Sequence, residues 1–432
     1  MLFRSRAAAD VDVRSSMLWW KTRRKQLSSG GAHRPTARIT EKLKPISTIP
    51  RGVWVLGFVS MLMDISSELI HSLLPIFMVS ALGASVFMVG IVEGIAESTA
   101  LIVKVFSGTL SDYLGKRKGL TLLGYGLGAA SKPLFALATS VPWVLTARFI
   151  DRIGKGIRGA PRDALVADLT PPQIRGAAYG LRQSLDTVGA FLGPLLAIGL
   201  MIVWSGDFRM VFWFAVIPAM LSVLLLAVGV HEPIAARADH KAPLVRWRTL
   251  KQLSGAYWWV VIVGAVFTLA RFSEAFLILR ARENGLPDAF APTVLIVMNA
   301  VYALSAYPMG RIADRMSHQK LLVCGVVVLI VSDIALAQAQ GLALVFAGVV
   351  LWGLHMGMTQ GLLAAMVANA APPALRGTAF GFFFFVSGLA MLVASVLAGL
   401  LWDKLGAATT FYAGALFAAV ALMMLMRQIK SA

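Results

Sequence analysis

From residue 52 onward the chain alternates between long apolar stretches and short polar loops. Each stretch is close to the ~20 residues that an α-helix needs to cross the hydrocarbon core of a bilayer. The pattern predicts an all-α integral membrane protein with about twelve transmembrane helices. Their expected bounds are 52–80, 85–110, 119–139, 142–168, 175–203, 209–230, 255–281, 290–313, 319–338, 341–368, 376–401 and 407–427.

Residues 1–51 do not follow this pattern. They are rich in lysine and arginine, and they lack the apolar core that a signal peptide carries soon after its basic start. We expect a basic, disordered cytoplasmic tail. The alternative is that translation starts at Met17 or at a later codon.

The composition agrees with a bilayer as the solvent. Hydrophobic residues make up 58% of the chain and charged residues only 14%, against roughly a quarter charged in ordinary soluble domains. The net charge of +19 could indicate a nucleic-acid partner, but the basic residues lie in the tail and in alternate short loops. This distribution is the positive-inside pattern, so we expect no nucleic acid, cytoplasmic N- and C-termini and an inner (plasma) membrane location.

Two segments recur at nearly the same separation. The sequence Gly108–Asp112 matches Gly310–Asp314, and Pro171–Gly180 resembles Pro372–Gly381, so the copies lie 202 and 201 residues apart. We infer a tandem duplication with an N-terminal bundle at 52–230, a cytoplasmic linker at 231–254 and a C-terminal bundle at 255–432. Six helices in each unit give the two repeats the same orientation in the membrane.

The loop after the second expected helix has a characteristic spacing of glycines, an acidic residue and basic residues: Gly108, Asp112, Gly115, Lys116 and Arg117. Its copy in the second half has Gly310, Asp314 and Arg315, with Ser317 at the place of the second glycine. This spacing resembles the loop motif between helices two and three of the major facilitator superfamily. The resemblance implies a two-domain transporter that works by alternating access, with its substrate and coupling sites near the bilayer midplane. It also implies that the motif is a cytoplasmic latch between the halves; the alternative is a basic turn that only sets topology.

Ionisable residues inside the expected helices are candidates for function, because charge is costly in a membrane. Asp64, Glu68 and His71 lie at i, i+4 and i+7, on one face of the first helix. Two carboxylates one turn apart resist joint ionisation, which favours a held or shared proton. We interpret this stripe as the coupling site, with Glu68 first. The alternative is a polar lining of a water-filled cavity.

Other helices carry further candidates. Family resemblance places a proton-coupling arginine at Arg148, although Asp151 and Arg152 replace the usual glutamine and glycine; the alternative is a structural pair of Asp151 with either arginine. We expect Arg271 and Glu274 to form an ion pair at i, i+3. The complete set of additional candidates is Glu93, Glu97, Arg148, Asp151, Arg182, Asp186, Arg271 and Glu274.

Gly189, Gly193 and Pro194 partly resemble the glycine-proline motif of the family's antiporters; the alternative is close helix packing by small residues. His355, with methionines nearby, is expected to line the cavity rather than to bind a metal. The single cysteine, Cys324, excludes an intrachain disulfide and a thiolate metal cage.

Together these patterns predict a proton-coupled secondary transporter that exports a small molecule by antiport. The alternative within the class is an importer or symporter of a metal chelate, siderophore or organic solute. A membrane-embedded enzyme or sensor is the rival outside it, but the sequence has no Walker motif, His-Glu-x-x-His or nucleophile elbow. We expect a monomer in the lipid bilayer without cofactor or metal, whose partners are protons and a small-molecule substrate.

Overall fold

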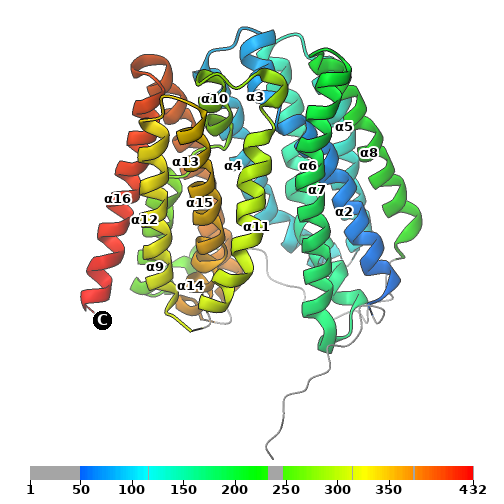
Figure 1. Ribbon diagram of the computed structural model, residues 1–432. Coiled ribbons are helices and arrows are strands. Elements are labelled where there is room, and N and C mark those ends of the chain that lie inside the picture. The colour runs from blue at the N-terminus through cyan, green and yellow to red at the C-terminus, as the bar shows by residue number, and fades with distance from the viewer. Residues whose placement is uncertain (1–48, 115, 232–246, 314, 373–374, 432) are drawn as a thin grey trace, which may run out of the picture. The chain divides into compact units, whose positions relative to one another are not determined.

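The structure is a computed structural model, and it describes residues 49–114, 116–231, 247–313, 315–372 and 375–431. The first 48 residues of the expected tail and most of the expected linker lie outside this range. Within it, the chain folds into two helical bundles (Figure 1).

The N-terminal bundle contains six long helical segments. They are α2 (Arg51–His71), which continues into α3 (Leu74–Ile76) and η2 (Phe77–Ala81), then α4 (Val86–Leu114), α5 (Arg117–Ala136), α6 (Val141–Leu169), η3 (Pro172–Ile174) with α7 (Arg175–Val203), and α8 (Phe208–Gly229).

The C-terminal bundle follows the short helix η4 (Trp247–Gln252). Its segments are α9 (Gly255–Leu269) with α10 (Ala275–Glu283), η5 (Asp288–Phe290) with α11 (Thr293–Ala313), α12 (His318–Ala337), α13 (Leu342–Thr359) with α14 (Leu362–Ala370), α15 (Arg376–Leu405), and α16 (Ala407–Ser431).

Each of the twelve expected spans coincides with one of these segments, which confirms the all-α membrane fold. Nine of the described segments are long and apolar enough to cross a membrane. The other three are α5, α6 and the pair α9–α10. Charged residues follow one another closely along α6, and α9 is apolar but has only 15 residues.

Several expected spans are interrupted. The segment expected at 52–80 breaks between His71 and Leu74. The segment expected at 255–281 breaks between Leu269 and Ala275, and the segment expected at 341–368 breaks at Gln360 and Gly361. Gly361 has φ +77°, a left-handed conformation that glycine adopts without steric cost. The sequence pattern predicted the bounds of these spans but not the breaks within them.

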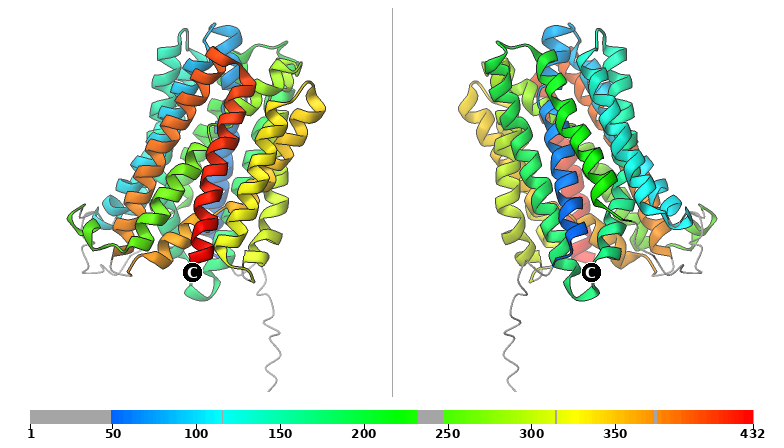
Figure 2. Two further views of the ribbon diagram at one scale, coloured as in Figure 1. Left: turned by 90° about the vertical axis from the view of Figure 1, so that its left-hand side faces the viewer. Right: turned by 90° about the vertical axis from the view of Figure 1, so that its right-hand side faces the viewer.

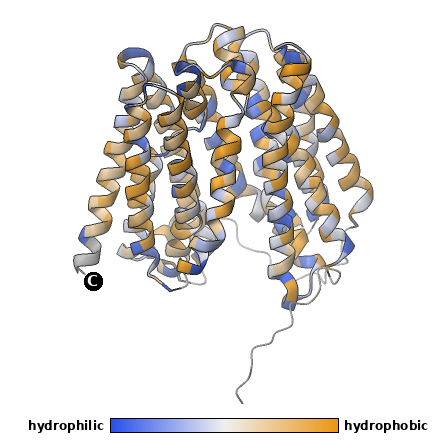
Figure 3. Ribbon diagram, viewed as in Figure 1, coloured by the Kyte–Doolittle hydropathy of each residue, from blue (hydrophilic) through white to orange (hydrophobic). Residues whose placement is uncertain are grey.

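The outward faces of the bundles are apolar. On α8, for example, the side chains of Trp213, Ile217 and Leu224 are exposed. Figure 3 shows hydrophobic residues along most of the helix length, with hydrophilic residues mainly at helix ends and between the bundles. In Figure 2, α16 lies on the flank of one bundle, and α5 and α8 lie on the flank of the other. These flanks are suited to contact with lipid.

The two bundles meet closely at the end that bears α3 and α10, which is the upper end in Figure 1 and which we call the closed end. There the Ser80 hydroxyl donates to Asp288 at 2.8 Å. The Val86 and Phe87 amides of α4 donate to the Asp403 carboxylate of α15 at 3.1 and 3.0 Å. Carboxylates of the C-terminal half thus accept hydrogen bonds from the N-terminal half, and these bonds keep the two halves together at this end.

Candidate functional site

A polar cavity lies between the two halves. It consists of two adjoining volumes of ≈ 290 Å³ and ≈ 520 Å³ that share Glu68, Glu97, Lys155, Ala190 and Asn299 as lining residues. A volume of this order can hold a small organic molecule.

The larger volume leads away from the closed end. Its lining residues Lys104, Gln183 and Gln360 have exposed side chains. Ser273, which lines the smaller volume, and Glu93, which its hydroxyl contacts, are buried. The cavity therefore opens at the end opposite to the closed end.

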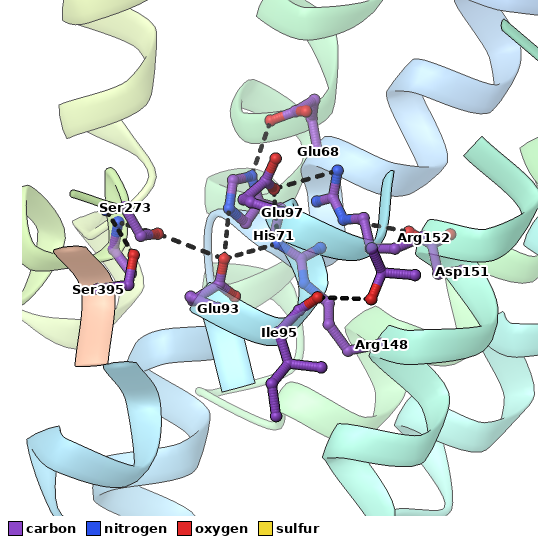
Figure 4. A network of polar contacts seen from close by, with 12 residues as sticks. Glu68, His71, Glu93, Ile95, Glu97, Arg148, Asp151, Arg152, Ser273 and Ser395 are labelled. Atoms are coloured by element: carbon purple, nitrogen blue, oxygen red, sulfur yellow. Dashed lines mark hydrogen bonds and ion pairs between the residues drawn. The ribbon is translucent and has the colours of Figure 1, made fainter. Parts of the chain in front are cut away.

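A cluster of ion pairs forms the inner end of the cavity (Figure 4). His71 Nδ1 lies 3.5 Å from Glu68 Oε2, and His71 Nε2 lies 3.5 Å from Glu93 Oε2. The same Glu93 oxygen accepts a hydrogen bond from Arg148 Nη2 at 2.9 Å. Glu68 lines both cavity volumes, whereas Glu93 and Arg148 are only 1% and 2% exposed. We call these four residues the His71 cluster; it leads from the cavity to a buried ion pair.

The His71 cluster also contacts the other half of the protein. The Ser273 hydroxyl donates to Glu93 Oε2 at 3.3 Å, and the Ser273 amide donates to the Ser395 hydroxyl at 3.3 Å. Ser273 lies in the break between α9 and α10, where its amide is free of the helical ladder. A change in the protonation of Glu93 would therefore change its contacts with both halves.

A second set of ion pairs runs from the cavity wall into the N-terminal bundle. Arg152 Nη1 lies 3.3 Å from Glu97, and its Nε lies 3.8 Å from Asp151. Asp151 pairs with Lys132 at 2.8 Å, and Lys132 also donates to Ser67 at 3.0 Å. Of the two pairings considered for Asp151, the one with Arg152 is present, and the one with Arg148 is not, because Arg148 turns toward Glu93. The closest cation to Asp151 is Lys132, which is not among the site residues predicted from the sequence.

A third set lies nearer the open end. Arg182 pairs with Asp186 at 2.5 Å and lies 3.7 Å from Asp163, which also pairs with Arg162 at 3.3 Å. Asp64 lines the same part of the cavity but has no ion-pair partner among the described residues. The three residues of the first-helix stripe therefore do not act as one group. Glu68 and His71 belong to the His71 cluster, whereas Asp64 lines the cavity without an ion-pair partner among the described residues.

Two expectations about the C-terminal half are wrong. Arg271 and Glu274 form no ion pair with each other, because they lie in the break between α9 and α10 and not on one helix face; both line the cavity instead. His355 is fully buried and does not line the cavity. Its Nδ1 lies 2.8 Å from the Gly325 carbonyl, and its ring packs 5.5 Å from that of Phe267.

The expected latch lies at the open end. Arg117 pairs with Asp168 of α6 at 2.6 Å, within its own half. The side chain of Asp112, and residues Gly115 and Asp314, lie outside the described part of the chain. A latch between the halves remains a prediction for a conformation in which this end is closed.

The glycines of the antiporter-like motif bring α7 against α2. A Cβ atom on Gly189 would lie 2.6 Å from the Met61 carbonyl, and one on Gly193 would lie 2.8 Å from Glu68 Cβ. Close helix packing explains both positions, and it places the backbone of α7 directly behind Glu68. Among the described residues no group of three or more His, Cys, Asp and Glu side chains could hold a metal ion.

Comparison with known proteins gives consistent results. The sequence model of the Major Facilitator Superfamily matches residues 56–280 and 275–431. The uncharacterized MFS-type transporter MJ1317 of Methanocaldococcus jannaschii is 30% identical over 388 residues, covering 88% of this chain and 95% of that protein. The multidrug resistance protein MdtH of Yersinia pestis is 25% identical, covering 77% and 82%. A crystal structure of a POT family transporter in complex with 5-aminolevulinic acid has a TM-score of 0.74 at 14% identity, covering 88% and 96%.

Proposed function

The chain belongs to the major facilitator superfamily, a family of multi-pass membrane transporters, and on this basis we propose that it exports a small organic solute in exchange for protons. In this proposal the two bundles alternate around the central cavity. We infer from the distribution of basic residues that both chain termini are cytoplasmic. The C-terminus lies at the open end (Figure 1), so in this proposal the cavity opens to the cytoplasm and the structure corresponds to an inward-open state.

The His71 cluster is the observation that carries the proton-coupling part of the proposal. Glu68 faces the cavity, and Glu93 binds Arg148 and Ser273, so that one carboxylate touches both halves. Protonation of Glu93 would remove the charge that attracts Arg148 and would weaken the link to Ser273. Proton binding and rearrangement of the halves are thereby joined at one group.

Export is proposed rather than import because the relative MdtH is named a multidrug resistance protein, and resistance of this kind agrees with removal of a drug from the cell. The partial resemblance of Gly189, Gly193 and Pro194 to the antiporter motif agrees with export, but close helix packing alone accounts for the two glycines. A symporter that imports an organic solute or a metal chelate is the second candidate, because a carboxylate cluster can serve either direction.

The experiment uses proteoliposomes loaded with the pH-sensitive dye pyranine. A panel of drugs, organic acids and siderophores is added outside, and the lumenal pH is recorded. An exchanger releases lumenal protons as solute enters, so the lumen becomes more alkaline. Acidification would identify a symporter, and turnover of a compound without any proton or solute movement would identify an enzyme.

Glu68→Gln removes the charge of the cavity-facing carboxylate, and we expect it to abolish the pH change. The matched control is Glu283→Gln, the same substitution at an exposed position of the closed end. Loss of the signal in both variants would show that folding, not coupling, was affected.

A further inference from the structure

The two walls of the cavity differ in chemistry. The wall from the N-terminal half carries charged side chains of α2, α4, α6 and α7. The wall from the C-terminal half carries two charged side chains, Arg271 and Glu274, and is otherwise aromatic or neutral: Phe272, Trp352, Met391, Asn299 and Tyr302. A substrate that satisfies both walls must itself have a charged part and an apolar part.

Several cations on the charged wall lack an ion-pair partner among the described residues. Lys155 lines both cavity volumes and has an exposed side chain. Arg158 is only 4% exposed, yet its Nη1 has no hydrogen-bond acceptor in the described part of the chain. Its guanidinium lies 4.9 Å from the centre of the Tyr125 ring, which fixes the side chain at the cavity wall. This Nη1 lies against α5, where a Cβ atom on Gly128 would be 3.1 Å away, whereas Arg158 also lines the larger cavity volume. A ligand in the cavity would therefore meet the positive charge of Arg158 rather than its Nη1 atom.

The balance of unpaired charge favours an anion. Among the described residues, the cavity-lining cations without an ion-pair partner are Lys104, Lys155, Arg158 and Arg271. The cavity-lining carboxylates without one are Asp64 and Glu274. With all of these groups ionised, the cations exceed the carboxylates by two (four against two). Protonation of either carboxylate would increase this excess.

The opposite wall suits a flat apolar group. The rings of Phe272 and Trp352 lie 5.6 Å apart between their centroids, and Phe272 also packs 5.5 Å from Phe411. Both Phe272 and Trp352 line the same cavity volume as Lys155. An anchored anion would therefore place the rest of a small molecule against these rings.

We propose that the substrate is an amphipathic organic acid. Its carboxylate binds Lys155 and Arg158, and its flat apolar part contacts Phe272 and Trp352. The transport of this ligand rests on the proposed function, but its binding does not, because binding needs no proton gradient.

The test measures binding to the purified full-length protein in detergent by isothermal titration calorimetry. The probes are naphthoate, neutral naphthamide and cationic naphthylmethylammonium, which share one ring system and differ in charge. We expect naphthoate to bind at least about tenfold more tightly than either analogue, since a charge-assisted hydrogen bond to a buried guanidinium contributes an effect of this order. Acetate, which lacks the ring, should bind more weakly than naphthoate.

Two variants test the binding residues. Lys155→Gln and Arg158→Gln should each weaken naphthoate binding by about tenfold. Lys251→Gln removes the same charge from an exposed position on η4, outside the cavity, and should leave binding unchanged. If Arg158→Gln does not purify as a folded protein, the exposed Lys155 decides the question.

The proposal is wrong if the ammonium probe binds as tightly as naphthoate, if none of the probes binds, or if Lys155→Gln retains full affinity. These outcomes are distinct from failure of the proposed function. Naphthoate binding without coupled proton movement would contradict proton exchange alone. Proton-coupled flux of cationic solutes, without naphthoate binding, would contradict only the organic-acid substrate.

Discussion

Replacing Asp403 by asparagine is expected to loosen the closed end. Helix α4 begins at Val86, and its first amides have no acceptor within the helix. Asp403 of the opposite half accepts the hydrogen bonds of the Val86 and Phe87 amides. The next two amides, of Met88 and Val89, donate to the hydroxyl and the carbonyl of Ser85. The carboxylate is thus a helix cap that is supplied across the interface between the halves.

The size of the effect follows from this geometry. Asparagine keeps one acceptor oxygen and loses the charge that interacts with the positive end of the helix dipole. The charge contributes ~0.3–1 kcal/mol and the lost hydrogen bond ~0.5–1.5 kcal/mol, and the exposure of Asp403 places the sum near the low end. A loss of about 1 kcal/mol shifts the equilibrium between the closed and opened forms of this end by about fivefold.

Spin-label distance measurements can detect this shift. In a Cys324→Ser background, labels at Thr139 and Gln340 would report across the closed end, since both residues are exposed in loops there on opposite halves. Asp403→Asn should raise the population of long distances.

The matched control is Asp207→Asn. Asp207 caps α8 in the same way, by accepting from Arg209 and Met210, but within one half. The control should leave the distances unchanged. Equal distance distributions for wild type and Asp403→Asn, or an equal shift for both variants, would refute the capping argument.

Two further substitutions test the packing of the helices. Gly90→Ala would drive a Cβ atom into the Ser395 carbonyl of α15, so we expect it to disfavour the closed end by ~1–3 kcal/mol and to increase the long spin-label distances; unchanged distances would contradict this packing. Lys132→Met would leave the buried Asp151 carboxylate without its closest cation, which is expected to cost ~3–5 kcal/mol and to lower the thermal unfolding temperature in detergent. The double variant Lys132→Met/Asp151→Asn should recover most of the loss, and failure to recover would argue against a pairwise interaction.

The sequence was sufficient to predict the architecture. Apolar stretches of membrane-spanning length are a local property, and they predicted all twelve segments with small errors at their ends. Two motif copies at separations of 202 and 201 residues indicated the duplication. The break at Gly361 also has a local signal, a glycine after a polar residue, but the same signal occurs within unbroken helices.

The partners in the site could not be predicted in the same way. Asp151 pairs with Lys132 because α5 and α6 present those faces to each other, and no spacing within one helix contains that information. The break after Leu269 contains no glycine or proline that would predict it from the sequence. In this break the Ser273 amide donates to the Ser395 hydroxyl of another helix instead of to a carbonyl of its own helix. The Ser273 hydroxyl in turn donates to Glu93.

The role of Glu68 in proton coupling is tested most directly by comparing two activities in the same proteoliposomes. Glutamine at position 68 mimics the protonated carboxylate and cannot release a proton. The account predicts that Glu68→Gln retains solute exchange at equal pH but loses uphill transport driven by a pH gradient. Uphill, pH-driven transport that survives in both Glu68→Gln and Asp64→Asn would contradict the account and would place the coupling site elsewhere.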